Sequence, residues 1–333
     1  MLKVFVTGGA GYVGSHCVRA LCEAGHEVLV FDNLKDGGHR EAVDRRATLV
    51  VGDLSDRSVV ALAMKEFGAD AVMHFAAYLN VGESVNEPLR YYRNNIANTL
   101  NLLESMHSWG VKNIVFSSTC ATYGNPDRLP ITENTSQCPI SPYGRTKLAV
   151  EWMLEDAASA WGLGATALRY FNASGASSDG TIGEDRTPEY HLIPLVLQVA
   201  LGQRDDIAIF GTDYPTPDGT CVRDYIHVED LASAHVLALE QQLPERLRAF
   251  NVGTGVGISV REVIDAARRV TGHAIPAVES PRRAGDPAEL FADSSQLQQS
   301  LGWRPRFTDI DDIVRSAWVW HQAHPNGYRS RLA

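Results

Sequence analysis

The stretch Thr7-Gly8-Gly9-Ala10-Gly11-Tyr12-Val13-Gly14-Ser15-His16 follows a short apolar strand, Leu2–Val6, and leads into a predicted helix. Gly9, Gly11 and Gly14 satisfy the Gly-x-Gly-x-x-Gly spacing in the context that this pattern requires. Glycines permit a tight turn and a close approach of backbone N–H groups to a diphosphate, and the helix N-terminus adds positive potential. The stretch therefore predicts a Rossmann-type fold that binds a dinucleotide.

An acidic residue lies where this fingerprint requires one. The apolar run Val28–Phe31 ends in Asp32, about twenty residues after the glycines. A carboxylate here accepts hydrogen bonds from the adenosine ribose and repels a 2′-phosphate, so NAD is predicted rather than NADP. The expected cofactor contacts of this region are Gly8, Gly11, Tyr12, Val13, Gly14, Asp32 and Asn33.

Strand and helix signals then alternate along the chain. Thr48–Val51, a helix from Ser55 to Phe67, and Ala71–Phe75 follow one another, and the strands are almost continuously apolar. This pattern predicts a doubly wound parallel sheet covered on both faces. Asp53 and Leu54 follow a strand end, where an adenine contact and a simple helix cap by Asp53 or Ser55 are both open interpretations. His74 is interpreted as a buried strand residue rather than a catalyst.

A second motif, Ser141-Pro142-Tyr143-Gly144-Arg145-Thr146-Lys147, begins with a good helix cap and a good first helical residue. Tyr143 and Lys147 are four residues apart and share a helix face. A phenol with a pKa of about 10 is a poor base at neutral pH, but a fixed cation favours the phenolate. Tyrosine and lysine at this spacing also occur on solvent-exposed helices that have no catalytic role. Here the dinucleotide loop and the hydroxyl groups at the end of the predicted strand, Ser117–Thr119, favour a catalytic interpretation, in which Tyr143 removes a proton during hydride transfer.

Composition limits the partners. The chain has 44% hydrophobic residues and a net charge of −10, which disfavours nucleic acid and anionic membranes as partners. Neither a signal peptide nor a run of about 20 apolar residues is found, so the cytoplasm is the expected location. The five cysteines form no Cys-x-x-Cys pair, and we expect neither a disulfide framework nor a metal site.

Several motifs together carry a family resemblance: Thr7–His16, Asp32–Leu34, Val81–Ser84, Ser141–Gly144 with Lys147, Arg169–Asn172, Asp213–Thr216, Val222–Val228 and Arg282–Asp286. On these motifs the chain resembles the extended short-chain dehydrogenase/reductases, and most closely the UDP-hexose 4-epimerases. The resemblance covers nearly the whole chain. The segments around Arg223 and Arg283 are its more specific part, because they are typical of enzymes that act on nucleotide sugars.

The resemblance implies roles for individual residues. Tyr143 would be the catalytic base, Lys147 its pKa partner and a nicotinamide-ribose ligand, and Thr119 the hydroxyl that bridges to the sugar O4. The further cofactor contacts expected are Asp53, Leu54, Phe75, Ala76, Ala77, Asn95 and Tyr170. The expected substrate contacts besides Thr119 and Tyr143 are Asn172, His191, Leu192, Phe210, Arg223, Arg283, Asp286 and Leu290. The two arginines suit a diphosphate because a guanidinium offers a planar donor fork.

Three positions depart from the family pattern. Leu79 occupies the place of a lysine that contacts the cofactor, His191 replaces the usual asparagine, and Leu290 occupies a gate position that is often tyrosine. These departures concern the substrate and cofactor contacts rather than the hydride chemistry.

The implied function is redox-neutral epimerisation at C4 of a UDP-hexose, UDP-glucose or UDP-galactose, through a 4-keto intermediate, with NAD held throughout. Epimerisation of UDP-xylose and UDP-arabinose or of UDP-N-acetylhexosamines is an alternative. A sugar-nucleotide dehydratase or decarboxylase and a non-catalytic NAD-sensing protein are less favoured. A dehydratase carries Asp-Glu after the strand-end threonine, whereas Thr119 is followed by Cys120-Ala121.

The expected architecture is an NAD-binding Rossmann domain over residues 1–170 and a smaller C-terminal α/β domain over 171–333 that binds the nucleotide sugar, with an interleaved boundary. By the same resemblance, the long helices after Pro88 and Ser141 are expected to pair in a homodimer.

Overall fold

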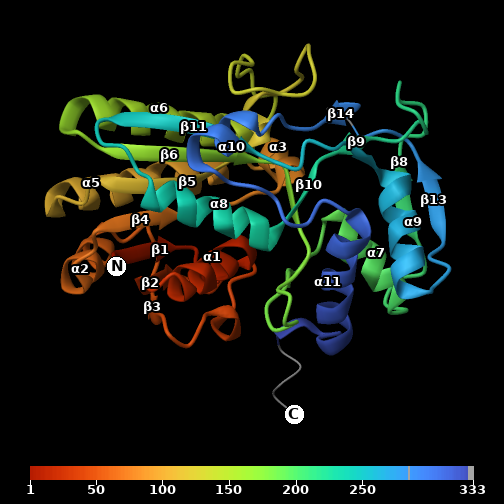
Figure 1. Cartoon of the computed structure of the whole chain (residues 1–333), viewed down its shortest axis with the longest axis horizontal. Helices are drawn as coiled ribbons and strands as arrows, with labels where there is room; N and C mark the ends of the chain where they lie inside the picture. Colours follow the sequence, from red (N-terminus) through yellow and green to blue (C-terminus); the bar gives the residue numbers. More distant parts are fainter. Residues whose placement is uncertain (284–285, 329–333) are drawn as a thin grey trace.

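A seven-stranded parallel sheet lies at the centre of the N-terminal unit in this computed structural model, which describes residues 1–283 and 286–328 (Figure 1). Its order is β11-β6-β5-β4-β1-β2-β3. The strands are β1 (Lys3–Thr7), β2 (Glu27–Asp32), β3 (Thr48–Val51), β4 (Ala71–His74), β5 (Asn113–Thr119), β6 (Gly164–Tyr170) and β11 (Arg246–Val252). The order reverses between β1 and β4, which confirms the predicted doubly wound Rossmann-type sheet.

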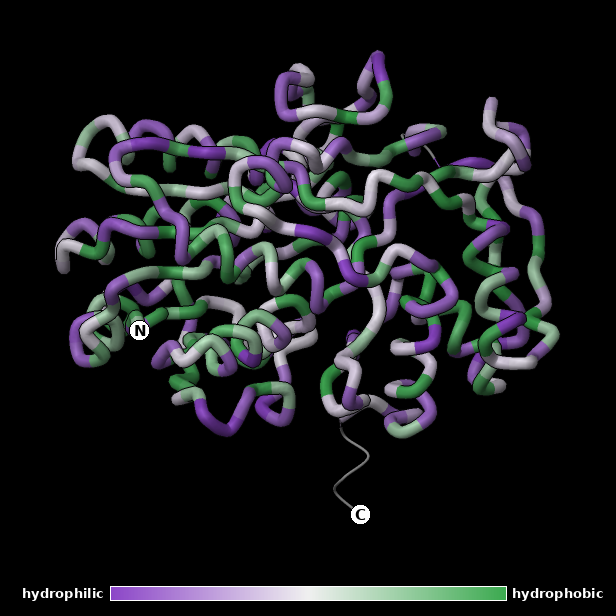
Figure 2. Tube along the Cα trace, in the orientation of Figure 1, coloured by the Kyte–Doolittle hydropathy of each residue, from purple (hydrophilic) through white to green (hydrophobic). Residues whose placement is uncertain are grey.

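Helices cover both faces of this sheet. One face carries α1 (Tyr12–Glu23), α8 (Val228–Glu240) and α10 (Ser295–Leu301); the other carries α2 (Arg57–Phe67), α5 (Asn98–Trp109) and α6 (Pro142–Trp161). Each face of the sheet has its own hydrophobic core, and successive side chains of β1 point to opposite faces. Val4 and Val6 pack toward α1 and α8, while Phe5 packs toward α2, α5 and α6. Hydrophilic residues concentrate on the peripheral loops (Figure 2).

The C-terminal unit has its own hydrophobic core, built on α7 (Leu192–Ala200), α9 (Val260–Thr271) and α11 (Ile310–Ala323). Three small sheets belong to this half of the chain: β8 (Ile207–Phe210) with β13 (Ala277–Ser280), β9 (Val222–Arg223) with β12 (Ile258–Ser259) and β14 (Glu289–Leu290), and β7 (Asn172–Ser174) with β10 (Tyr225–His227). Figure 1 places α7, α9 and α11 beside the large sheet.

The two units interleave along the chain. The sheet takes β11 from beyond residue 170, and α8 and α10 from the same half cover one of its faces. The connection from β4 to β5 contains α3 (Val81–Asn86), α4 (Pro88–Tyr91) and a π-helical turn, η2 (Tyr92–Ala97), before α5. The short 3-10 turns are η1 (Arg40–Ala42) and η3 (Cys120–Thr122). Within the described ranges, no helix has the length and apolar character that crossing a membrane requires.

Candidate active site

A cavity of about 150 Å³ opens at the carboxyl ends of β1, β2 and β4, beside the point where the strand order reverses. Ligands of doubly wound sheets bind at this place in the fold. Most of the expected cofactor contacts line it: Gly8, Gly11, Tyr12, Val13, Gly14, Asp32, Asn33, Asp53, Leu54, Phe75, Ala76, Ala77 and Tyr170. The structure therefore brings these residues together around one space.

Two positions of the glycine loop, Gly8 and Gly14, leave no room for a Cβ atom. Gly8 has a φ of 72°, and a Cβ there would lie 2.5 Å from the Ala76 nitrogen. A Cβ on Gly14 would lie 2.2 Å from the Gly8 oxygen. The loop thus packs its backbone tightly on α1 and on the end of β4. This tight turn at a helix N-terminus fits a dinucleotide diphosphate.

Asp32 lies at the adenosine end of this cavity and is buried. Its carboxylate accepts hydrogen bonds from the Ala10 nitrogen at 3.0 Å and the Leu34 nitrogen at 2.8 Å. Burial raises the pKa of Asp32, while these backbone donors act to lower it. An acceptor fixed in this way fits the ribose hydroxyls of NAD.

Asp53 accepts a hydrogen bond from Asn33 Nδ2 at 3.0 Å and another from the Ser55 nitrogen at 3.0 Å. The helix cap expected at Asp53 or Ser55 is wrong, because Asp56 caps α2 by accepting from Ser58 and Val59. Asp53 is therefore free of the capping function and faces the cavity. His74 is a buried strand residue, as predicted, and its ring contacts Thr7 Oγ1 and Thr99 Oγ1.

Asn95 does not line this cavity, and neither do Tyr143 and Lys147. Its amide Nδ2 donates to the Tyr78 oxygen and to Thr146 Oγ1, both at 3.0 Å, and its Oδ1 accepts from the Tyr78 nitrogen at 2.9 Å. Buried and engaged in this way, Asn95 ties η2 to α6 rather than presenting a free amide to a ligand. Its neighbours Asn94 and Asn98 line the cavity instead.

The helix that carries Tyr143 begins as the sequence predicts. Ser141 caps α6 by accepting from the Gly144 nitrogen at 3.1 Å, and Pro142 is the first helical residue. Lys147 is buried one turn further along, and its Nζ donates to the Ser117 oxygen of β5 at 2.7 Å. Burial lowers the pKa of Lys147 to about 7, while nearby Glu151 acts to raise it.

The pKa of Tyr143 differs from the expectation. Burial raises it well above its ordinary value, Tyr170 adds to the rise, and a hydrogen bond with Thr119 acts in the opposite direction. Lys147 lies one turn further along the same helix, and its ammonium is directed at the Ser117 oxygen. Its role as the pKa partner of Tyr143 stays a prediction.

Several expected substrate residues lie on strands of the C-terminal unit, namely Asn172, Phe210, Arg223 and Leu290, whereas Arg283 and Asp286 lie between β13 and β14. Leu290 of β14 is paired in register with Arg223 of β9. Arg223 Nη2 lies 3.3 Å from Asp286 Oδ1, and the Arg283 guanidinium lies 3.8 Å from the centroid of the Phe210 ring. These contacts join the segment after β13 to β8 and β9. Ala284 and Gly285, within the Arg282–Asp286 motif, lie outside the described residues.

Asn172 lies on β7, where its side-chain Nδ2 donates to the Asp224 oxygen at 3.1 Å. Leu290 packs against a small cluster that includes Tyr123 and Phe171, and Cys120 packs against the same cluster. Because Cys120 directly follows Thr119, the gate position lies near the end of β5. The substrate-side and catalytic residues thus approach each other across the two units.

His191 precedes α7, whose first residue is Leu192. Its Nδ1 lies 2.8 Å from Glu184 Oε1 and 3.2 Å from Glu189 Oε1. Burial opposes protonation, but the two carboxylates raise the pKa of His191 to about 9. The three donor atoms lie within 4.8 Å of one another, so these residues form a compact ion-paired cluster when His191 is protonated.

Sequence reasoning missed several residues of the cavity wall: Phe31, Lys35, Asp36, Gly37, Gly38, Gly52, Tyr78, Asn94, Asn98 and Arg186. Leu79, named as a departure from the family pattern at a cofactor contact, also lines the cavity. The Gly37-Gly38 pair shortly after Asp32 was the available signal for a loop that approaches the ribose. Arg186 had no local signal, because it reaches this wall from a segment more than a hundred residues away along the chain.

Comparison with known proteins matches residues 4–253 to the NAD dependent epimerase/dehydratase family. A UDP-glucose 4-epimerase of Lacticaseibacillus casei is 50% identical over 331 residues, which cover 99% of this chain and 100% of that protein. A crystal structure of the Bifidobacterium longum UDP-glucose 4-epimerase in complex with NAD+ and UDP is 40% identical, with a TM-score of 0.94, and the match covers 98% of this chain and 100% of that one.

A structure from Stenotrophomonas maltophila, a UDP-glucose-4-epimerase with bound NAD and formylated UDP-arabinopyranose, is 44% identical. Its TM-score is 0.93, and the match covers 100% of both chains. The similarity to these proteins is therefore one of whole chains, not of a single motif.

Proposed function

This chain belongs to the NAD-dependent epimerase/dehydratase family, and from that premise we propose that it inverts C4 of a UDP-hexose, interconverting UDP-glucose and UDP-galactose. The observation that carries the proposal is the cavity at the strand ends, with its dinucleotide loop and ribose carboxylate, beside the start of α6, where Lys147 lies one turn after Tyr143 and donates to the Ser117 oxygen at 2.7 Å. The full-length identity to UDP-glucose 4-epimerases supports the same substrate class.

The cavity residues fit NAD, which when bound accepts the hydrogen of C4 as hydride and returns it to the opposite face of the sugar. Gly8, Gly11 and Gly14 hold the diphosphate, and Asp32 holds the adenosine ribose. Lys147, buried against Ser117, holds the nicotinamide ribose and keeps the helix face in place.

Tyr143 moves the proton of the reaction. Its phenolate oxygen takes the proton of the sugar 4-OH and later returns it to the 4-keto oxygen, so the protein ends each turnover unchanged. Thr119 bridges the phenol and the sugar O4 and aligns them. Because burial makes the free phenol a weak acid, its ionisation depends on positive charge beside it, which Lys147 supplies when protonated and the oxidised nicotinamide ring supplies when bound.

The diphosphate of the substrate is assigned to Arg223 and Arg283. Asp286 orients Arg223 at 3.3 Å, and Phe210 supports the Arg283 guanidinium from 3.8 Å. In a protein of net charge −10 these local cations are needed to hold a dianion. The other residues assigned to the substrate are Asn172, His191, Leu192 and Leu290.

The structural relative with formylated UDP-arabinopyranose motivates a second candidate, epimerisation of a UDP-pentose. Leu290, which packs with Tyr123 and Phe171, disfavours N-acetyl groups but does not separate a hexose from a pentose, which only lacks C6. A dehydratase is disfavoured by Cys120 and Ala121, which place no carboxylate after Thr119.

We also propose a homodimer formed through the helices after Pro88 and Ser141. Val85 on α3 is 61% exposed, Leu89 on α4 is 78% exposed, and Trp152 on α6 is 58% exposed. Exposed apolar side chains on neighbouring helices are typical of an interface. Light scattering of the purified protein tests this assignment, and a mass of one chain would contradict it. The cytoplasmic location stays a prediction.

Incubation of the purified protein with UDP-galactose, without added cofactor, tests the proposed function. Proton NMR should show UDP-glucose appearing until a fixed ratio is reached, starting from either sugar. Absence of conversion from both sugars by a protein that contains NAD would overturn the assignment.

A further inference from the structure

The wall of the cofactor cavity carries more negative than positive charge. Asp32, Asp36 and Asp53 line it, whereas the lining cations are Lys35 and Arg186. Lys35 is exposed, while the Arg186 side chain is only 15% exposed. A buried cation interacts more strongly with an anion than a solvated one does. Arg186 is therefore the lining group best suited to an anionic part of a ligand.

Arg186 lies close to the loop that follows Asp32. A Cβ built on Gly37, in the ribose loop, would lie 3.8 Å from Arg186 Cγ and 3.9 Å from its Cζ. Tyr170, at the end of β6, lines the same cavity. Arg186 therefore lies against the ribose loop, in the cavity that the glycine loop also lines. In a dinucleotide the diphosphate is bonded to the ribose, so a long side chain at the ribose loop lies within reach of it.

The guanidinium also has donor capacity to spare. Glu184 Oε1 lies 3.8 Å from Arg186 Nε, beyond hydrogen-bond distance, and the Tyr190 ring centroid lies 5.4 Å from the guanidinium carbon. Among the residues that the structure describes, the buried Nε has no hydrogen-bond partner. An arginine offers five N–H donors, so these neighbours leave several for a ligand.

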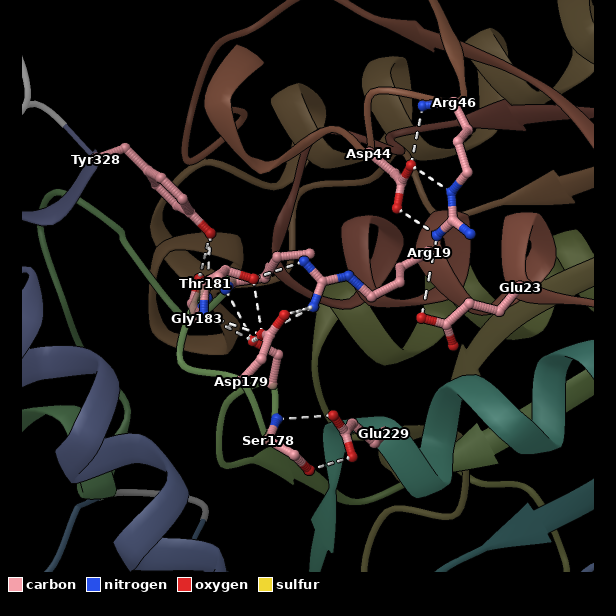
Figure 3. Close-up of polar contacts among 12 residues, drawn as sticks. Arg19, Glu23, Asp44, Arg46, Ser178, Asp179, Thr181, Gly183, Glu229 and Tyr328 are labelled. Carbon is pink, nitrogen blue, oxygen red and sulfur yellow. Dashed lines mark hydrogen bonds and ion pairs between the residues drawn. The ribbon is translucent and has the colours of Figure 1, made fainter.

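The segment that carries Arg186 is held in place by three anchors (Figure 3). Arg19 of α1 pairs with Asp179 at 2.9 Å, Glu229 of α8 accepts from the Ser178 nitrogen at 2.8 Å, and the Gly183 nitrogen donates to the Tyr328 hydroxyl at 3.1 Å. Asp185 is held as well, since its Oδ2 accepts from the Tyr328 nitrogen at 2.9 Å. A side chain on so fixed a segment loses little freedom when it binds a ligand.

We propose that Arg186 is a cofactor-binding residue whose guanidinium pairs with the diphosphate of NAD. The glycine loop binds one side of that group through backbone N–H donors, and Arg186 neutralises its charge. This inference rests on the proposed function, because it takes NAD as the dinucleotide.

The test measures NAD retention rather than turnover. Wild type, Arg186→Gln, Arg186→Lys and the control Arg204→Gln, an exposed arginine outside the cavity wall, are purified alike and washed by gel filtration. We expect Arg186→Gln to weaken NAD binding about 10- to 100-fold, the worth of one charged hydrogen bond. Arg186→Lys should weaken it less but measurably, because lysine cannot reproduce the planar fork. Arg204→Gln should retain NAD as wild type does.

Displacement of labelled NAD locates the effect. ADP-ribose contains the diphosphate and adenosine does not, so Arg186→Gln should weaken displacement by ADP-ribose and leave displacement by adenosine unchanged. Equal weakening for both competitors, or wild-type retention of NAD in Arg186→Gln, would overturn the inference. If Arg186→Gln does not fold, wild-type NAD affinity in Arg186→Lys overturns it equally. A wild-type protein that binds no NAD would instead contradict the proposed function itself.

Discussion

Glu151 of α6 and Arg169 of β6 form a buried ion pair, in which Arg169 Nη2 lies 2.6 Å from Glu151 Oε2 and the two side chains are 7% and 2% exposed. Glu151 lies one helical turn beyond Lys147, and Arg169 also donates to the Tyr123 hydroxyl at 2.9 Å. The pair therefore fixes the helix of Tyr143 and Lys147 against the end of the sheet.

Removing one partner should be costly. Glu151→Ala leaves the Arg169 guanidinium buried without its counter-charge, and we expect a loss of about 3–5 kcal/mol in the free energy of unfolding. Urea unfolding measures this loss. The double variant Glu151→Met with Arg169→Met removes both charges and should be more stable than Glu151→Ala. A loss below about 1 kcal/mol in Glu151→Ala would contradict the assigned importance of the pair.

Tyr143→Phe should lower kcat by about 10²–10⁴-fold, the usual worth of general acid–base catalysis, with little change in substrate binding. The phenol acts mainly in the transition state, where the proton moves. Steady-state kinetics with UDP-galactose, together with the NAD content of the variant, measure the effect. A near-normal kcat in a folded, NAD-containing variant would remove Tyr143 from the mechanism.

The His191–Glu184 pair should make stability depend on pH. The pKa of His191 is about 9 in the folded protein, above the ordinary value of about 6.5 that it has when unfolded. Its contribution is therefore fully present below about pH 6.5 and is lost as the pH rises through 9. Thermal unfolding of wild type and His191→Asn between pH 6 and 9.5 checks this. The difference in melting temperature between the two proteins should shrink as the pH rises. A difference that stays constant would show that protonated His191 does not stabilise the fold.

Leu290 should set the tolerance for a bulky group on the sugar. Leucine is shorter than tyrosine but still branched, so UDP-hexoses should be preferred over the N-acetyl forms by about 10–200-fold in kcat/KM. Leu290→Tyr should increase this preference. The measurement is kcat/KM for UDP-N-acetylgalactosamine against UDP-galactose in both proteins. Equal values in wild type would refute the preference, and an unchanged ratio in Leu290→Tyr would show that another residue forms the gate.

The sequence was most informative where function depends on local geometry. The glycine loop, Asp32 and the Ser141 cap each involve residues a few positions apart, and backbone conformation there follows from residue type. The doubly wound sheet could be predicted because buried parallel strands read as apolar runs.

Contacts between distant segments could not be read in this way. β11 is the edge strand beside β6, and its start, Arg246-Leu247-Arg248, alternates charge and apolarity as an edge strand does, but no local signal shows that it pairs with a strand about eighty residues earlier. Asn95 has the right residue type for a ligand contact, but its amide is used by Tyr78 and Thr146. The pKa of Tyr143 depends on burial, which no spacing of residues reports.

The fate of the C4 hydrogen is the most direct test of a redox-neutral epimerisation on a retained cofactor. UDP-galactose labelled with deuterium at C4 is incubated with the purified protein in ordinary water, and the UDP-glucose formed is analysed by NMR and mass spectrometry. We predict that the product keeps the deuterium at C4, because the hydride that leaves the sugar returns to it within the same site. Replacement of that deuterium by solvent hydrogen would contradict this account.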